Sequence, residues 1–182
     1  MRTRSRGHAV ILLGLVVLLA FGCRRADELR EATEYRPLRF QTGPAMDIEA
    51  VLTNGSISIR GEVGRTETEI TAILVASGRS LDRAQRRVED LDISLTQQGE
   101  RIEIRFEPPK EAETWRELPT ARFEILTSDR GALHVEATDG SVRVVGIDGE
   151  VSILAEGGEV DVRQVSGTLE VQAATAPFGS RR

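Results

Sequence analysis

The sequence predicts an all-β fold, mainly a β-solenoid (β-helix) of nine-residue units with about two units per coil. Three observations support this prediction. Glycine is abundant, with 17 among 182 residues, and five of these glycines recur at a strict period of nine. Apolar residues fill the same two positions after each of the five. A fixed short period of this kind indicates stacked architecture. One amphipathic helix and one hairpin are expected as an insert in the solenoid.

The repeat extends from residue 131 to residue 171. Each unit reads Gly-x-apolar-x-apolar, a short strand whose alternate side chains share one face. The apolar positions are Leu133, Val135, Val142, Val144, Val151, Ile153, Val160, Val162, Leu169 and Val171. Seven positions after the glycines, larger apolar residues occur only in alternate units, as Ile147 and Val165. This alternation favours two units per coil, and a triangular coil of three units stays open.

The two coil types predict different contacts. A two-unit coil places Arg143 beside Asp161 on neighbouring strands, a favourable cross-strand pair. A three-unit coil places His134 near Asp161 instead. The repeated unit also occurs upstream, because residues 53–64 parallel residues 138–149.

A helix and a hairpin are expected between the two repeat regions, over about 79–107. Ser80 can cap a helix that runs to about Asp90, with Leu81, Ala84, Val88 and Leu91 on one face. Alternating apolar residues on both sides of Gln98-Gly99 then predict the hairpin. Residues 107–120 form a charged connector containing Trp115. The insert is expected to cover one end of a single solenoid domain at 38–175, and residues 176–182 are expected to form a tail.

The N-terminus has the pattern of a cleavable signal, predicted over residues 1–22. Three arginines precede an unbroken apolar stretch from Ala9 to Phe21, too short for a comfortable membrane span. The sequence Leu19-Ala20-Phe21-Gly22-Cys23 resembles the lipobox of bacterial lipoproteins. That resemblance implies cleavage before Cys23 and lipid attachment (diacylglycerol, palmitate) to this residue. The alternatives are an uncleaved signal anchor and simple secretion with an incidental cysteine.

Residues 23–37 are expected to form the lipidated N-terminus and a charged tether, with a short helix over 26–34. Arg24 follows Cys23 where an inner-membrane retention aspartate would stand. By resemblance, this indicates the outer membrane of the cell envelope, on its periplasmic or surface face.

The order of these elements resembles a known family. Repeat units at 53–64 and 129–171, separated by a helix and hairpin and preceded by a lipoprotein signal, are similar to the β-helix domains of bacterial envelope proteins known as putative adhesins, a domain of unknown function. The resemblance covers about residues 38–175. It implies a repetitive β stack, and it implies no particular activity because that family has no agreed catalytic signature.

Composition excludes several kinds of site. The chain has one cysteine and two histidines, which leaves no disulfide within the chain and no multi-cysteine zinc site. A net charge of −5 argues against a nucleic-acid partner. Asp139 and Asp148 lack the companion residues of calcium-binding nonapeptides, so they are interpreted as turn formers. His134 is interpreted as an outward, solvent-facing residue. No catalytic, metal or cofactor residue is predicted.

Two functions remain after these exclusions. The first is a non-enzymatic, lipid-anchored envelope protein that presents a rigid β surface for binding or adhesion. Its partner would be another envelope protein, a polysaccharide, or a second copy at the open end of the solenoid. The alternative is a carbohydrate-active enzyme that uses the outward carboxylates Glu150, Glu159 and Asp161. Trp115 and Tyr35 fall in connecting segments, and the helix arginines Arg79, Arg83, Arg86 and Arg87 are interpreted as a solvated face.

Overall fold

The computed structural model describes residues 29–174, which form an all-β fold with one α-helix, as predicted. The strands are β1 (Arg30–Gln41), β2 (Met46–Glu62), β3 (Glu67–Gly78), β4 (Ser94–Gln98), β5 (Arg101–Phe106), β6 (Thr120–Ser128), β7 (Arg130–Glu156) and β8 (Val160–Ala174). The helices are α1 (Leu81–Glu89) and a short 3-10 helix, η1 (Lys110–Thr114). The predicted signal peptide, Cys23 and the 176–182 tail lie outside the described residues.

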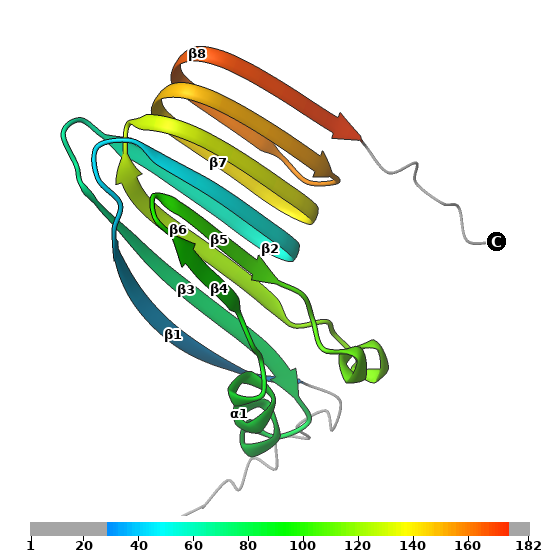
Figure 1. Cartoon of the computed structure of the whole chain (residues 1–182). Helices are drawn as coiled ribbons and strands as arrows, with labels where there is room; N and C mark the ends of the chain where they lie inside the picture. Colours follow the sequence, from blue (N-terminus) through cyan, green and yellow to red (C-terminus); the bar gives the residue numbers. More distant parts are fainter. Residues whose placement is uncertain (1–28, 175–182) are drawn as a thin grey trace, which may run out of the picture.

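Strand β2 organises the sheet because its two halves have different neighbours. The strand order is β1-β3-β6-β2-β5-β4, with β7 paired to β2 and β8 paired to β7. The first half of β2 pairs with β5, the second half pairs with β6, and both halves pair in parallel with β7. The sheet therefore turns a corner near Asn54, and its two layers face each other. Figure 1 shows β7 and β8 winding back on themselves as stacked turns beside β2.

The sheet as a whole is mixed and not closed, so the structure does not show the predicted β-solenoid over 38–175. The pairs β1–β3, β3–β6 and β4–β5 are antiparallel. The hairpin β4–β5 continues the sheet from β2 in place of covering its end, which corrects the expected role of the insert. The physical reason is that β5 carries inward apolar residues at alternate positions, which suit a place in the layer.

The register within the stack follows the repeat. Val142 pairs with Val160 and Val144 with Val162, an offset of 18 residues. The upstream unit pairs with the repeat as the sequence parallel predicts, because Gly55 lies opposite Gly140 and Ile57 opposite Val142. Two nine-residue units thus separate each residue of β7 from its partner in β8.

Close approach of successive strands explains the glycine period. A Cβ atom built on Gly149 would overlap the carbonyl oxygen of Gly131, and one on Gly167 would overlap that of Gly149. On the opposite corner, Gly158 stands in the same relation to Gly140. Alternate glycines therefore stack in two columns, which is why the period is nine along the chain and 18 along the stack.

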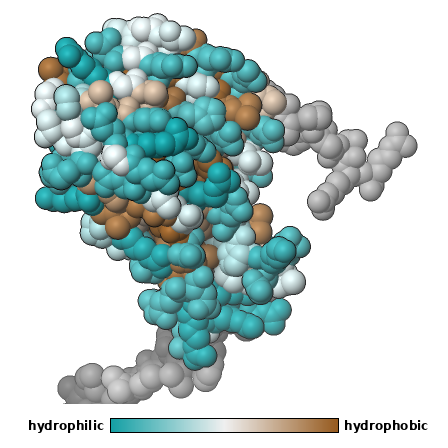
Figure 2. Space-filling model, in the orientation of Figure 1, coloured by the Kyte–Doolittle hydropathy of each residue, from teal (hydrophilic) through white to brown (hydrophobic). Residues whose placement is uncertain are grey.

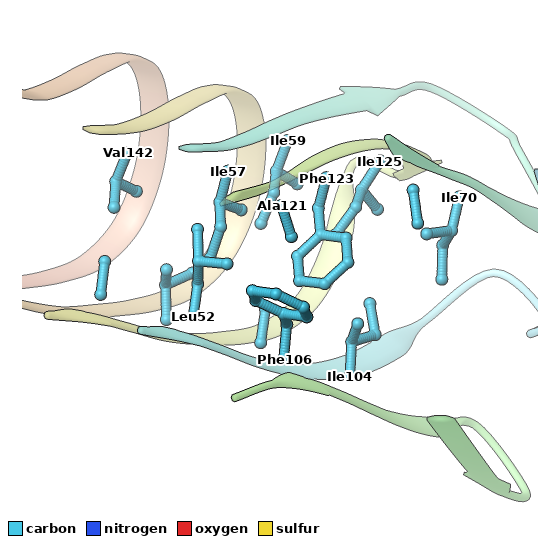
Figure 3. Packing of buried hydrophobic residues seen from close by; sticks show 14 of the residues in the cluster. Leu52, Ile57, Ile59, Ile70, Ile104, Phe106, Ala121, Phe123, Ile125 and Val142 are labelled. Atoms are coloured by element: carbon cyan, nitrogen blue, oxygen red, sulfur yellow. The ribbon is translucent and has the colours of Figure 1, made fainter. Parts of the chain in front are cut away.

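The core lies between the two layers and consists mainly of aliphatic side chains. Figure 3 shows Leu52, Ile104 and Phe106 of one layer facing Ile57 and Phe123 of the other. All five are at most 1% exposed. Seven aromatic residues suffice for the whole chain because stacked valine, leucine and isoleucine fill the remaining space.

Helix α1 begins where its sequence predicts. Ser80 is the N-cap, and its hydroxyl accepts a hydrogen bond from the backbone N–H of Arg83. Ala84 and Val88 are fully buried, and Leu91 just beyond the helix is 2% exposed. Leu81 is 62% exposed, so its placement on the buried face was wrong. The helix packs against β1 and β3.

Strand β1 corrects the expected helix over 26–34 and places residues 30–37 in the sheet in place of a tether. It pairs with β3 over its whole length, from Arg30 to Gln41. Sequence periodicity does not reveal it because Glu34 and Arg36 occupy half-buried positions on its inner face. These two side chains form a paired salt bridge at 2.9 and 3.0 Å, which lowers the pKa of Glu34.

Candidate functional site

The strand β8 ends the stack and forms the candidate site, which we call the β8 edge (residues 159–171). Among residues 29–174, β8 pairs with β7 alone, so its other side presents backbone N–H and C=O groups without strand partners. Figure 1 shows β8 at the end of the molecule opposite α1.

The inner face of the β8 edge is apolar and incompletely covered. Leu169 is 48% exposed and Val171 is 42% exposed. The residues one coil earlier, Val151 and Ile153, are at most 1% exposed because β8 covers them. Val160, Val162 and Val165 are partly buried against the core. The last turn of the stack thus has the same apolar pattern as the core and lacks a layer above it among the described residues. Figure 2 shows apolar surface interspersed among hydrophilic residues at this end.

The outer face of the β8 edge borders a polar groove of about 240 Å³. The polar residues that line it come from four neighbouring strands and the turn before β8; they are Ser56, Ser58, Arg122, Ser141, Arg143, Glu159 and Asp161. Arg143 Nε donates to one carboxylate oxygen of Asp161 at 3.0 Å, and Arg163 Nε donates to the other at 2.8 Å. The predicted Arg143–Asp161 contact is therefore confirmed, and with it the two-unit offset.

The groove unites two of the three predicted outward carboxylates. Glu159 and Asp161 both line it, whereas Glu150 lies opposite Thr168 in the other layer. The side chain of Asp161 is only 19% exposed, less than a freely solvated residue. Both of its oxygens are engaged by guanidinium groups, and a general acid would need an oxygen free to reach a glycosidic bond. The groove is thus arranged to present charged and hydroxyl groups to a polar ligand or polypeptide.

His134 is placed away from this groove. It lies in the first part of β7 opposite Glu49, and its Nε2 is 3.1 Å from a carboxylate oxygen of Glu136. Its side chain is 44% exposed. Asp139 lies at the corner opposite Asn54, a turn position as predicted. Within residues 29–174 no group of three or more His, Cys, Asp or Glu residues is arranged to hold a metal ion.

The helix arginines separate into two groups. Arg86 forms an exposed salt bridge with Asp82 at 2.8 Å. Arg79, Arg83 and Arg87 line a cavity of about 580 Å³ together with Arg116 from the connector. Sequence reasoning did not include Arg116 in this group because it lies 29 residues beyond Arg87 along the chain, past the hairpin. Arg122 of the outer groove was missed for a similar reason: only the β6–β2 pairing brings it beside Ser56.

The two aromatic residues singled out in the sequence have different surroundings. The guanidinium of Arg87 lies over the ring of Trp115 with its central carbon 4.3 Å from the ring centroid, a cation–π geometry. Tyr35 lies on the outer face of β1 and is 66% exposed. Trp115 is therefore a packing residue of the arginine group, and Tyr35 is a surface residue of a strand.

Comparison with known proteins gives two solved structures. No protein-family model and no curated protein matches the sequence. The chain is similar to a structure described as a putative cell adhesion protein from Clostridium sporogenes, with 10% identity and a TM-score of 0.47 over 79% of this chain and 68% of that one. It is also similar to a structure described as a putative adhesin from Bacteroides fragilis, with 11% identity and a TM-score of 0.36 over 76% of this chain and 61% of that one.

A separate finding concerns membrane-spanning helices. Within residues 29–174 the structure has no helix with the length and apolar character that a membrane crossing requires.

Proposed function

We propose that the chain is a non-enzymatic, lipid-anchored protein of the cell envelope, with the outer membrane as its expected location, that binds an extended polypeptide segment at the β8 edge. The observation that carries this proposal is a difference between the edges of the sheet. Exposed edge strands pair readily with other chains, and proteins usually block them with proline, inward charges or short strands. The β1 and β4 edges have such features, and the β8 edge does not.

The β1 edge is blocked in two ways. Pro37 lies within the strand and removes one backbone N–H donor. Glu34 and Arg36 point toward the inner face, where an added strand would have to cover their charges. The β4 edge is only five residues long, and its Gln97 side chain donates to the backbone carbonyls of Gln41 and Gly99.

The β8 edge has the opposite character. Its 15 residues include no proline, and its inward positions carry only apolar side chains. Charges occur on its outer face, where Asp161 and Arg163 pair with each other at 2.8 Å. An added strand could therefore bury apolar side chains on Leu169 and Val171 and satisfy the backbone groups of β8. This is recognition by strand addition, in which backbone hydrogen bonds give affinity and alternate side chains give specificity.

This binding mode also gives a role to the finer fold. We infer that residues 131–174 are a solenoid-like stack with 18 residues per coil, and that a partner strand adds the next layer. A polypeptide fits this role better than a polysaccharide because only a polypeptide supplies a regular series of N–H and C=O groups.

The position of the chain start supports the same function. Leu29, the first described residue, lies beside the start of α1. Figure 1 shows that end opposite β8. An anchor at Cys23 would therefore hold the α1 end near the membrane and direct the β8 edge away from it.

Site-specific photo-crosslinking in living bacteria tests the proposal. A photo-reactive amino acid replaces Thr168 on β8 or, as the matched control, Thr33 on β1; both threonines are exposed residues of edge strands. We expect protein adducts from position 168 and none from position 33. Adducts should disappear when Val171→Lys places a charge on the inner face of β8. Equal labelling from both positions, or none from 168, would contradict the proposal, and an adduct of twice the chain mass would identify a second copy as the partner.

A further inference from the structure

Four arginines from two separate segments surround one open cavity at the α1 end, which we call the arginine cavity. They are Arg79, Arg83, Arg87 and Arg116, and they line a space of about 580 Å³ with Leu29 and Thr114. None of the described residues that line it is acidic. The molecule has a net charge of −5, so this concentration of positive charge runs against the overall balance.

Local structure fixes this arrangement. Arg79, Arg83 and Arg87 are spaced four residues apart, from just before the N-cap to the last turn of α1, so they lie along one side. Arg87 donates to the backbone carbonyl of Ser77 and stacks on Trp115, and Arg116 follows Trp115 directly. The contact between Arg87 and Trp115 thus connects the helix to the connector that supplies the fourth arginine.

The charges on the two sides of α1 differ. Arg86 is neutralised by Asp82, one turn earlier in the helix. Inside the cavity, partial burial lowers the pKa of Arg87, and the positive charge of Arg83 lowers it further. Two like charges held this close are relieved by an anion bound between them.

A larger cavity of about 980 Å³ adjoins this one and shares Leu29, Arg79 and Arg116. It adds Arg30 as well as the carboxylates Glu31 and Glu117. Glu117 accepts a hydrogen bond from the Ser77 hydroxyl at 2.8 Å, which holds it at the edge of the β3 end. The acidic groups are therefore beside the arginine cavity and not among the residues that line it.

We propose that the arginine cavity binds the phosphate groups of anionic membrane lipids and holds the α1 end against the bilayer surface. Guanidinium groups match phosphate oxygens in charge and in paired hydrogen-bond geometry. The position of the cavity at the membrane rests on the anchoring in the proposed function: Leu29 lines it, and Cys23 lies six residues earlier, an extended reach of about 20 Å. Figure 2 shows mainly hydrophilic surface at this end, as a headgroup contact requires.

Trp115 provides a probe for this contact because it is the only tryptophan in the chain. The full chain, with its own N-terminal segment, is reconstituted into vesicles that contain a headgroup-attached nitroxide quencher. One set of vesicles is phosphatidylcholine alone, and the other also contains phosphatidylglycerol. We expect stronger quenching of Trp115 in the anionic vesicles, and we expect added salt to remove the difference.

Two variants of the same helix distinguish the cavity from general charge. Arg83→Gln removes a charge inside the cavity, and Arg86→Gln removes one outside it. We expect Arg83→Gln to reduce the ratio of docked to undocked protein in anionic vesicles about fivefold, with a clearly smaller change for Arg86→Gln. Equal quenching in both vesicle types, or equal effects of the two variants, would overturn the proposal.

A soluble anion is the competing ligand, and inorganic phosphate tests it. The full chain in neutral vesicles is titrated with phosphate at constant ionic strength. No saturable change in Trp115 fluorescence is expected, and a saturable change abolished by Arg83→Gln would assign the cavity to a soluble phosphate compound and overturn the lipid assignment. Fatty-acid labelling of Cys23 is read separately, because the apolar N-terminal segment retains the chain in vesicles without acylation. Failure of the anchor and failure of the cavity are thus distinguishable.

Discussion

Arg143 donates its Nε hydrogen to the carboxylate of Asp161 at 3.0 Å, from a strand that lies 18 residues earlier in the chain. This contact exists because two nine-residue units bring the chain back beside itself. It lies on the outer face of the layer, while Val142, Val144, Val160 and Val162 face inward. Inner and outer positions alternate strictly here, so substitutions at neighbouring residues should have very different effects.

Val144→Asp should reduce the free energy of unfolding by more than about 3 kcal/mol, because it buries a charge without a partner. Val144 is fully buried. Arg143→Ala should cost less than about 1 kcal/mol, since its side chain is 62% exposed and its ion pair is screened by water. Urea unfolding followed by circular dichroism measures both. Similar losses for the two variants would show that the assignment of inner and outer faces is wrong.

The glycine columns give a second prediction. Gly149→Ala should destabilise the fold by about 3 kcal/mol, because the added Cβ overlaps the carbonyl oxygen of Gly131 and the strands must separate. Gly64→Ala is the control: Gly64 has a φ of +75° and no atom near the added Cβ, so it isolates the conformational cost of about 1 kcal/mol. A larger loss at Gly64 than at Gly149 would refute the packing explanation of the period.

The corner at Gln164 gives a prediction of the opposite sign. Gln164 has a φ of +54°, the only positive value at a non-glycine residue among those described. One coil earlier, the same corner holds Gly146, with a φ of +74°. Gln164→Gly should therefore raise the free energy of unfolding by about 0.5–1 kcal/mol, as the strain relieved exceeds the added chain entropy. A rise in the thermal midpoint measures this gain, and a fall would mean that the Gln164 side chain stabilises the corner.

The lipid anchor is tested at a single atom. Cys23→Ser removes the sulfur to which the acyl glycerol would attach, so the variant should lose labelling by radioactive fatty acid. The unprocessed precursor should accumulate and migrate more slowly on gels than the processed chain. Labelling that persists in Cys23→Ser would show that the lipobox interpretation is wrong.

Much of the stack could be predicted from the sequence because its apolar and glycine positions are strictly periodic. The alternate corners Ile147 and Val165 indicated 18 residues per coil, and the register of β7 with β8 has that offset. The N-cap at Ser80 and the hairpin were also predictable, since each depends on a short local pattern.

The remainder depended on contacts that no local pattern encodes. Strand β1 was missed because Glu34 and Arg36 stand where apolar residues would mark an inner face, and their mutual salt bridge replaces the expected burial. The pairing of β2 with three strands fixes the open, mixed sheet, and such pairing joins segments far apart in the chain. The arginine cavity required Arg116, which reaches α1 only after the hairpin is placed.

Hydrogen–deuterium exchange on the β8 edge tests the central claim most directly. The chain is compared in isolated envelope membranes and after purification, with peptides covering 160–174 as the probe and peptides covering 30–41 of β1 as the control. Strand addition predicts that the backbone amides of β8 exchange more slowly in the envelope, while those of β1 exchange at the same rate in both samples. Identical exchange of β8 in the two samples would contradict the assignment of this edge as the binding site.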